Sequence, residues 1–102
     1  MTIVLQQTMP EGVTIEMLDE VTVEMGVEKD PPKGLLLHVH FVENGRTRII
    51  DVWESAEAFE TFQRDQLMPA IEKVMQRLGI PMDGAPQPET SITEVATVVR
   101  GS

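Results

Sequence analysis

The sequence predicts an α+β fold in which four strands and two helices follow one another in the order β-α-β-β-α-β. Three observations predict this order. Two runs rich in β-branched and apolar residues flank Asn44-Gly45, a pair that is typical of a tight hairpin turn. Apolar residues with helical spacing occur both before and after this hairpin. A short β-branched run lies near each end of the chain, where the first and last strands are expected.

The first strand is expected at Thr2 to Gln7, because this short stretch is rich in β-branched residues. The first helix is expected between Thr14, a suitable N-cap, and Gly26, a suitable left-handed C-cap. Its apolar residues lie three or four positions apart and share one helix face: Ile15, Leu18, Val21 and Met25. Its acidic residues are expected to form a solvated face: Glu16, Asp19, Glu20 and Glu24. The stretch from Val27 to Gly34 contains a pair of prolines and is expected to be a surface loop.

The hairpin is the strongest structural signal in the sequence. Its strands are expected at Leu35 to Val42 and at Thr47 to Trp53, separated by Glu43-Asn44-Gly45-Arg46. Asn-Gly is the preferred pair for a two-residue type I′ turn, because both central residues of that turn need a positive φ. The turn sets the register, so each residue of one strand has a predicted partner on the other.

The second helical segment is expected to consist of two helices. Ser55 is a favourable N-cap for the first of them. Pro69 lacks a backbone N–H and would kink an uninterrupted helix, whereas it suits the first turn of a new one. The segment therefore divides into Ser55 to Gln66 and Pro69 to Leu78. After a proline-containing loop, the β-branched stretch from Ile92 to Val99 is predicted to be the last strand.

This order of elements is that of the ferredoxin-like fold, a four-stranded antiparallel sheet with both helices on one face. The other face of the sheet has no cover within the chain. Both faces of the hairpin are expected to be buried, because apolar residues occupy both sets of alternating positions. In the first hairpin strand, one side holds Leu35, Leu37, Val39 and Phe41, and the other holds Leu36, His38, His40 and Val42. We therefore expect a homodimer in which two sheets meet face to face.

Length and composition bound the class of protein. A chain of 102 residues has room for one domain, so residues 1–102 are expected to form a single unit. The absence of cysteine excludes disulfides, a thiolate nucleophile, a cysteine zinc site and an iron–sulfur cluster. The net charge of −9 opposes binding to nucleic acid or to an anionic membrane. A cytoplasmic location is expected, because the apolar runs are short and the first residues lack the layout of a secretion signal.

One part of the chain resembles a known family. Asp51-Val52-Trp53-Glu54-Ser55, followed by Phe59, Phe62 and then Leu67-Met68-Pro69-Ala70, is similar to the dimeric α/β-barrel superfamily. More narrowly, it resembles small members related to the antibiotic-biosynthesis monooxygenases. The resemblance implies a homodimer whose two sheets close into an α/β barrel. Relatives include cofactor-free quinone-forming monooxygenases, polyketide cyclases, lactone isomerases and haem-degrading enzymes, so it identifies a fold better than a reaction.

The chain departs from these relatives at two points. Haem-degrading relatives carry a histidine on the helix after a strand tryptophan, whereas this chain has Trp53 but no histidine after His40. Axial haem ligation of that kind is therefore not expected. Cyclases and monooxygenases of the superfamily often use a tyrosine beside a histidine, and this chain has no tyrosine. A reaction of that type would need another residue to orient the substrate oxygen.

The register about the Asn-Gly turn brings polar residues together on one face of the hairpin. Counted outward from the turn, the predicted pairs are Glu43 with Arg46, Phe41 with Arg48, His40 with Ile49, His38 with Asp51, and Leu36 with Trp53. Opposed side chains lie about 4.5–5.5 Å apart at Cβ, close enough for a hydrogen bond between an imidazole and a carboxylate. We therefore expect His38 and Asp51 to form a pair, with His40 on the same face.

His38 is the candidate general base, because a carboxylate partner orients the ring and fixes its tautomer. Asp51 would orient His38, and His40 would bind or polarise a substrate oxygen. The candidate substrate contacts form an apolar wall beside them: Trp53, Phe59, Phe62, Leu36 and Ile49. Two other interpretations remain open. The pair could be a structural or dimer-interface interaction, or the two histidines could bind a metal with Asp51 as third ligand.

These residues support two functional hypotheses. The first is a small dimeric enzyme that acts on an aromatic or polyketide-like molecule without a metal or organic cofactor. Proton removal by His38 would lead to oxygen insertion, ring closure or isomerisation. The second is a non-catalytic dimeric module that binds a small apolar ligand or a protein partner.

Overall fold

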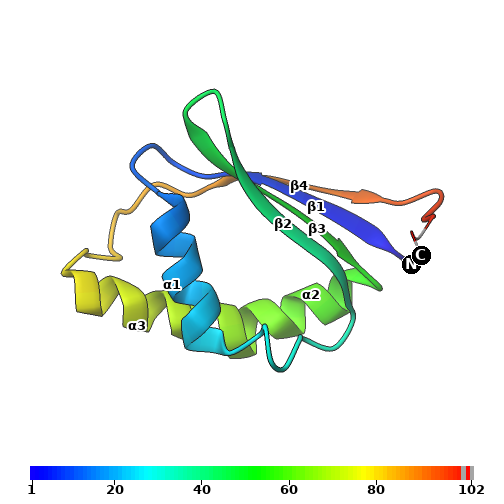
Figure 1. Ribbon diagram of the computed structural model, residues 1–102, viewed down its shortest axis with the longest axis horizontal. Helices are drawn as coiled ribbons and strands as arrows, with labels where there is room; N and C mark the ends of the chain where they lie inside the picture. Colours follow the sequence, from blue (N-terminus) through cyan, green and yellow to red (C-terminus); the bar gives the residue numbers. More distant parts are fainter. Residues whose placement is uncertain (100, 102) are drawn as a thin grey trace.

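The fold is described by a computed structural model, which covers residues 1–99 and 101. The strands are β1 (Ile3–Thr8), β2 (Leu35–Glu43), β3 (Arg46–Trp53) and β4 (Glu89–Glu94). The helical elements are α1 (Ile15–Met25), α2 (Ala56–Phe62), the π-helical turn η1 (Gln63–Leu67) and α3 (Met68–Leu78). The strands form one antiparallel sheet in the order β2-β3-β1-β4, and the helices lie together on one side of it (Figure 1). This architecture confirms the predicted ferredoxin-like α+β fold.

Helix α1 begins and ends where the sequence predicts. The hydroxyl oxygen of Thr14 accepts a hydrogen bond from the N–H of Met17 at 3.2 Å, which satisfies one of the free donors of the first turn. Gly26 adopts the left-handed conformation, with a φ of 69°, and its N–H donates to the carbonyls of Thr22 and Val23. Both ends are set by local chemistry, which explains why they are predictable from the sequence.

The hairpin has the predicted turn and most of the predicted register. Asn44 and Gly45 have φ values of 52° and 76°, as a type I′ turn requires. The pairs from Glu43 with Arg46 as far as His38 with Asp51 are confirmed.

The predicted pairing of Leu36 with Trp53 is wrong. Leu35 pairs with Trp53 and Leu37 with Val52, so Leu36 is the extra residue of a β-bulge. The bulge lies where the chain enters β2 from a loop held close to α2. A Cβ atom added to Gly34 would lie 2.7 Å from the Cβ of Ala58. The start of β2 is therefore positioned by packing on α2 as well as by the turn.

The second helical segment is continuous, which corrects the predicted break before Pro69. Elements α2, η1 and α3 run end to end beneath the sheet (Figure 1). In the π-helical turn the N–H of Met68 donates to the carbonyl of Gln63, five residues earlier. This wider turn accommodates the missing N–H of Pro69, which then lies at the start of α3.

The last strand is shorter and earlier than predicted. It spans Glu89–Glu94 instead of Ile92 to Val99. The reason is its partner: β4 pairs only with β1, and the first residue of β1, Ile3, lies opposite Glu94, so the antiparallel ladder stops there. As an edge strand with a single neighbour, β4 leaves all six of its residues exposed.

The core lies between the sheet and the helices, and burial of each of its large apolar side chains contributes about 1.5–3 kcal/mol. Its buried cluster consists of Ile3, Leu5, Trp53, Phe59 and Phe62. The opposite face of the sheet is open in the single chain. On that face Leu37 is 50% exposed and Val39 is 41% exposed, so the hairpin is not buried on both faces within one copy. In the part of the chain described here, no helix has the length and apolar character needed to cross a membrane.

Candidate functional site

The candidate site is built on the helix-facing side of β2 and β3. These strands place His38 opposite Asp51, and Nδ1 of His38 donates a hydrogen bond to Oδ1 of Asp51 over 2.6 Å. The Asp51 side chain is 8% exposed, whereas that of His38 is 37% exposed. Because one partner is a carboxylate and the distance is short, the hydrogen bond is charge-assisted. The pairing predicted from the register is therefore present.

Trp53 contributes a polar contact to this pair that the sequence did not indicate. Its ring N–H donates to Oδ2 of Asp51 at 3.2 Å, so each carboxylate oxygen of Asp51 has a donor. Trp53 has no exposed surface, and its ring is clamped by Phe59 and Phe62 at centroid distances of 5.7 and 5.0 Å. Because the buried Trp53 holds the carboxylate of Asp51 in place, Asp51 in turn fixes the orientation of the His38 imidazole.

The contacts continue outward from His38 to the surface. Nε2 of His38 lies 3.1 Å from Nδ1 of His40, and the two rings meet edge to face at 74°. Nε2 of His40 in turn donates to Oδ1 of Asp19 on α1 at 3.0 Å. We call these five residues the polar chain, from its buried to its exposed end: Trp53, Asp51, His38, His40 and Asp19. All four ring nitrogens of its two histidines are in hydrogen-bond contact.

Asp19 is the member of the polar chain that sequence reasoning missed. It was expected on a solvated helix face, and its side chain is indeed 58% exposed, but it also contacts the sheet. Asp19 lies four residues after Ile15, at the edge of the apolar face of α1. The sequence signal for this contact was an acidic residue at the edge of the apolar helix face, in a helix that packs over a strand with two histidines.

The residues predicted to contact a substrate divide into two groups. Trp53, Phe59 and Phe62 are core residues, exposed by 9% or less. Leu36 and Ile49 are half-buried, the first at the bulge of β2 and the second opposite His40 on β3. Three of the five are therefore packed in the core, where Trp53 is itself the buried end of the polar chain, and two are partly exposed on the hairpin.

The two nitrogens between His38 and His40 face each other and do not converge with Asp51 on a common point. Over residues 1–99 and 101, no group of three or more histidine, aspartate or glutamate side chains is arranged to hold a metal ion.

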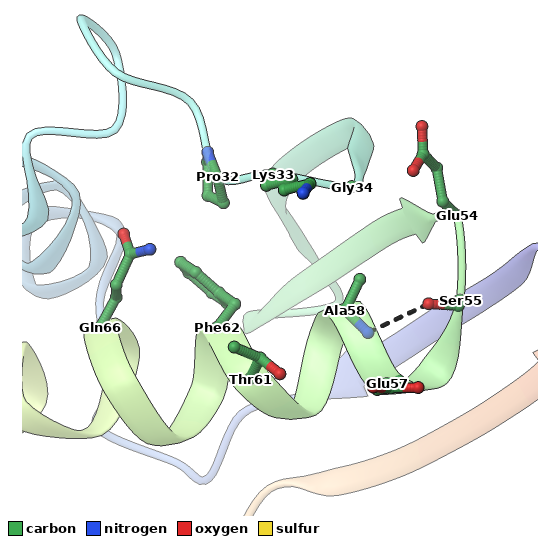
Figure 2. Close-up of a pocket in the computed structure, with 10 residues that line it drawn as sticks. All are labelled: Pro32, Lys33, Gly34, Glu54, Ser55, Glu57, Ala58, Thr61, Phe62 and Gln66. Carbon is green, nitrogen blue, oxygen red and sulfur yellow. Dashed lines mark hydrogen bonds between the residues drawn. The ribbon is translucent and has the colours of Figure 1, made fainter.

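Two surface hollows lie away from the polar chain. The larger, about 360 Å³, opens between the loop before β2 and helix α2, where the ring of Phe62 rises toward Pro32 (Figure 2). The smaller, about 210 Å³, lies between the end of α1 and the start of α3 and is lined by Met25 and Pro69 among others. Neither hollow is lined by His38 or Asp51, and the side chain of His38 is itself 37% exposed to solvent.

Comparison with known proteins gives a likeness of fold. No protein-family model matches the sequence. No curated protein matches it either. Among solved structures, a Deinococcus radiodurans protein provisionally named an antibiotic biosynthesis monooxygenase is 16% identical, with a TM-score of 0.60 over 100% of this chain and 99% of that one.

Two further structures of the same fold are of proteins named for an activity. A monooxygenase of Streptomyces coelicolor, solved with the ligand nanaomycin D, is 18% identical, with a TM-score of 0.59 over 98% of this chain and 92% of that one. SnoaB, a cofactor-independent oxygenase of Streptomyces nogalater, solved as a mutant, is 16% identical, with a TM-score of 0.56 over 98% and 96%. At these identities the likeness establishes that the chain has the fold of the antibiotic-biosynthesis monooxygenases.

Proposed function

We propose that this chain is a small enzyme that removes a proton from an aromatic or polyketide-like molecule, with His38 as the general base. The reaction would be of the monooxygenase, cyclase or isomerase type and would need no cofactor. The observation that carries the proposal is the 2.6 Å contact between His38 and the buried carboxylate of Asp51. The general kind of reaction is supported by similar folds whose names include a monooxygenase and a cofactor-independent oxygenase.

The contact with Asp51 determines which nitrogen of His38 acts. Because Nδ1 donates its proton to Asp51, the lone pair available for a substrate proton is on Nε2. As His38 becomes an imidazolium, the negative charge of Asp51 stabilises it. Trp53 keeps Asp51 in place through its hydrogen bond to the second oxygen. General-base catalysis requires an oriented base of this kind. Such catalysis typically contributes about 10²–10⁴-fold to a reaction rate.

His40 marks where the reacting atom would lie. Its Nδ1 is 3.1 Å from Nε2 of His38, the position that an acidic C–H or O–H group of a substrate would occupy. A substrate entering there displaces this contact, and the His40 ring can then donate a hydrogen bond to the substrate oxygen. Ile49, half-buried opposite His40, and Leu36, half-buried at the bulge of β2, would contact a flat ring above the core residues Trp53, Phe59 and Phe62.

The carbanion formed in this way can react without a cofactor. In the oxygenase form of the proposal it reduces dioxygen and forms a carbon–oxygen bond, which gives a peroxide. The peroxide then loses water with a second hydrogen of the same carbon, and a carbonyl remains. Both oxygen atoms and all electrons are accounted for by the substrate and dioxygen. Attack on an internal carbonyl would give the cyclase outcome, and return of the proton at another atom the isomerase outcome.

The oxygenase form is tested with 1,8-dihydroxyanthrone, a flat molecule whose acidic methylene becomes a quinone carbonyl. The expected result is quinone formation and oxygen uptake above the rate without protein. His38→Ala is expected to lower the protein-dependent rate by about 100-fold or more. Glu20→Gln, an exposed change on α1, is the control and should leave the rate unchanged. Equal rates for the wild type and His38→Ala would reject His38 as the base.

A second candidate function is a non-catalytic dimeric module that binds a small apolar ligand or a protein partner. The observation that favours it is the position of both hollows, which lie away from His38 and Asp51. On this alternative, His38→Ala would lower the melting temperature or dissociate the dimer. On the enzyme proposal, the same variant stays folded and loses turnover. Thermal melting and light scattering of one variant therefore separate the two functions.

A further inference from the structure

We infer that Asp19 is a positioning residue that holds a shared proton on His40 and so leaves Nε2 of His38 free to act as a base. The inference deepens the proposed function and rests on it for the role of His38. It begins from the outer half of the polar chain, where Nε2 of His40 donates to Asp19 at 3.0 Å. This contact joins α1 to the sheet, so the chemistry of β2 depends on a residue of another element.

Counting protons along the polar chain gives its charge. Nδ1 of His38 must carry a proton to donate to Asp51, and Nε2 of His40 must carry one to donate to Asp19. The 3.1 Å contact between the two rings needs one further proton, on either of the facing nitrogens. With no proton there, two lone pairs would face each other. With two protons there, one on each facing nitrogen, two N–H groups would point at each other and clash. We therefore infer three protons on the four ring nitrogens, an arrangement in which the two rings would share one positive charge.

The position of the middle proton decides whether His38 can act. When the proton is on Nδ1 of His40, the lone pair of Nε2 of His38 accepts that N–H, and it can take a proton from a substrate once the substrate displaces the contact. When it is on Nε2 of His38, that nitrogen is blocked. Each ring has a carboxylate on its outer side, Asp51 for His38 and Asp19 for His40, and each carboxylate attracts the proton toward its own ring.

The attraction of Asp19 for the shared proton therefore opposes that of Asp51. The buried carboxylate would otherwise draw the shared proton onto His38, because its charge is less screened by solvent than that of an exposed group. Asp19 can offset part of this attraction because it contacts His40 directly. Its acidic neighbours on α1, Glu16 and Glu20, are exposed and make no hydrogen bond to either histidine within the described residues.

The protonation of each ring nitrogen can be measured directly, because the protein contains two histidines and hence four ring nitrogens. The nitrogen NMR shift of an imidazole differs strongly between a protonated and a bare position. In wild-type protein labelled at its histidines and measured near neutral pH, we expect two protonated outer nitrogens. The two facing nitrogens should have averaged shifts, because they share one proton.

Asp19→Asn is the critical variant. The asparagine oxygen can still accept from His40, so the geometry is kept while the charge is lost. We expect the shift of Nε2 of His38 to move toward the protonated value and that of Nδ1 of His40 toward the bare value. Asp19→Glu restores the charge and should return both shifts toward the wild type. Glu20→Gln removes a charge from the same helix without touching His40 and should change neither.

The inference is overturned if Asp19→Asn leaves the two facing nitrogens at their wild-type shifts, or if Glu20→Gln moves them equally. The proposed function is tested separately by oxidation of 1,8-dihydroxyanthrone, where Asp19→Asn should lower the protein-dependent rate by about tenfold. Unchanged shifts together with loss of turnover in His38→Ala would reject the role of Asp19 alone. If Asp19→Asn changes the two nitrogen shifts but the wild type does not oxidise 1,8-dihydroxyanthrone, the proposed oxygenase reaction is rejected and the role of Asp19 in placing the proton is kept.

Discussion

Asp51 is the residue on which the candidate site depends most, since it links the core to the histidines. It is 6% exposed and accepts hydrogen bonds from His38 on one oxygen and from Trp53 on the other. Buried polar groups are stable only when they are paired. The Trp53 N–H has no exposure to water, so this carboxylate serves the stability of the core as well as the site.

The first prediction follows from this shared role. Asp51→Ala removes the acceptor of the Trp53 N–H and should lower the free energy of unfolding by about 1–3 kcal/mol. Urea denaturation measures the loss. The double variant with Trp53→Phe, which also removes the donor, should lose less than the sum of the two single variants. Strictly additive losses would show that the hydrogen bond between these residues does not contribute to stability.

At the residue scale, the sequence could predict His38 opposite Asp51 but not the contact with Asp19. The first depends on counting positions outward from Asn44-Gly45, a turn whose geometry is set by two residues. The second depends on how α1 lies across the sheet, which the spacing of its own residues does not determine. Local chemistry is visible in the sequence, whereas contacts between elements require their relative placement.

The same distinction applies at the scale of elements. The caps of α1 were predictable because Thr14 and Gly26 act on their own backbone neighbourhood. The bulge at Leu36 was not, because it arises where the entry loop of β2 packs against α2. The continuity of α2 with α3 was also missed, because a π-helical turn absorbs the missing donor of Pro69 without ending the helix.

The close approach of the β2 entry loop to α2 gives a prediction with an internal control. Gly34 and Gly12 have nearly equal positive φ values, 89° and 92°. A Cβ on Gly34 would lie 2.7 Å from the Cβ of Ala58, whereas a Cβ on Gly12 would have open space. Gly12→Ala should therefore cost only the backbone strain, about 1 kcal/mol, and Gly34→Ala about 1–3 kcal/mol more. Equal melting temperatures for the two variants would contradict a tight packing of the loop on α2.

At the scale of the whole molecule, the open face of the sheet is the feature that a single chain leaves unexplained. Cross-strand pairs on this face join Leu37 with Val52 and Val39 with Ile50. The helices lie on the opposite side of the sheet (Figure 1), and Leu37 and Val39 are 50% and 41% exposed. A contiguous apolar surface of this kind is typical of an interface, and a self-complementary sheet face suits a two-fold homodimer.

The expected homodimer is tested by placing one charge on the open face. Leu37→Lys buries an unpaired lysine if two sheets meet there, so the variant should be a monomer in light scattering while the wild type is a dimer. Val23→Lys is the matched control, because Val23 is also apolar and is 77% exposed, but lies on α1. That variant should remain dimeric. The net charge of −9 per chain makes two copies repel each other, so raised salt should strengthen the wild-type dimer and leave Leu37→Lys monomeric. A wild-type monomer at every salt concentration, or a dimer that Leu37→Lys leaves intact, would mean that the open face is not where two copies associate.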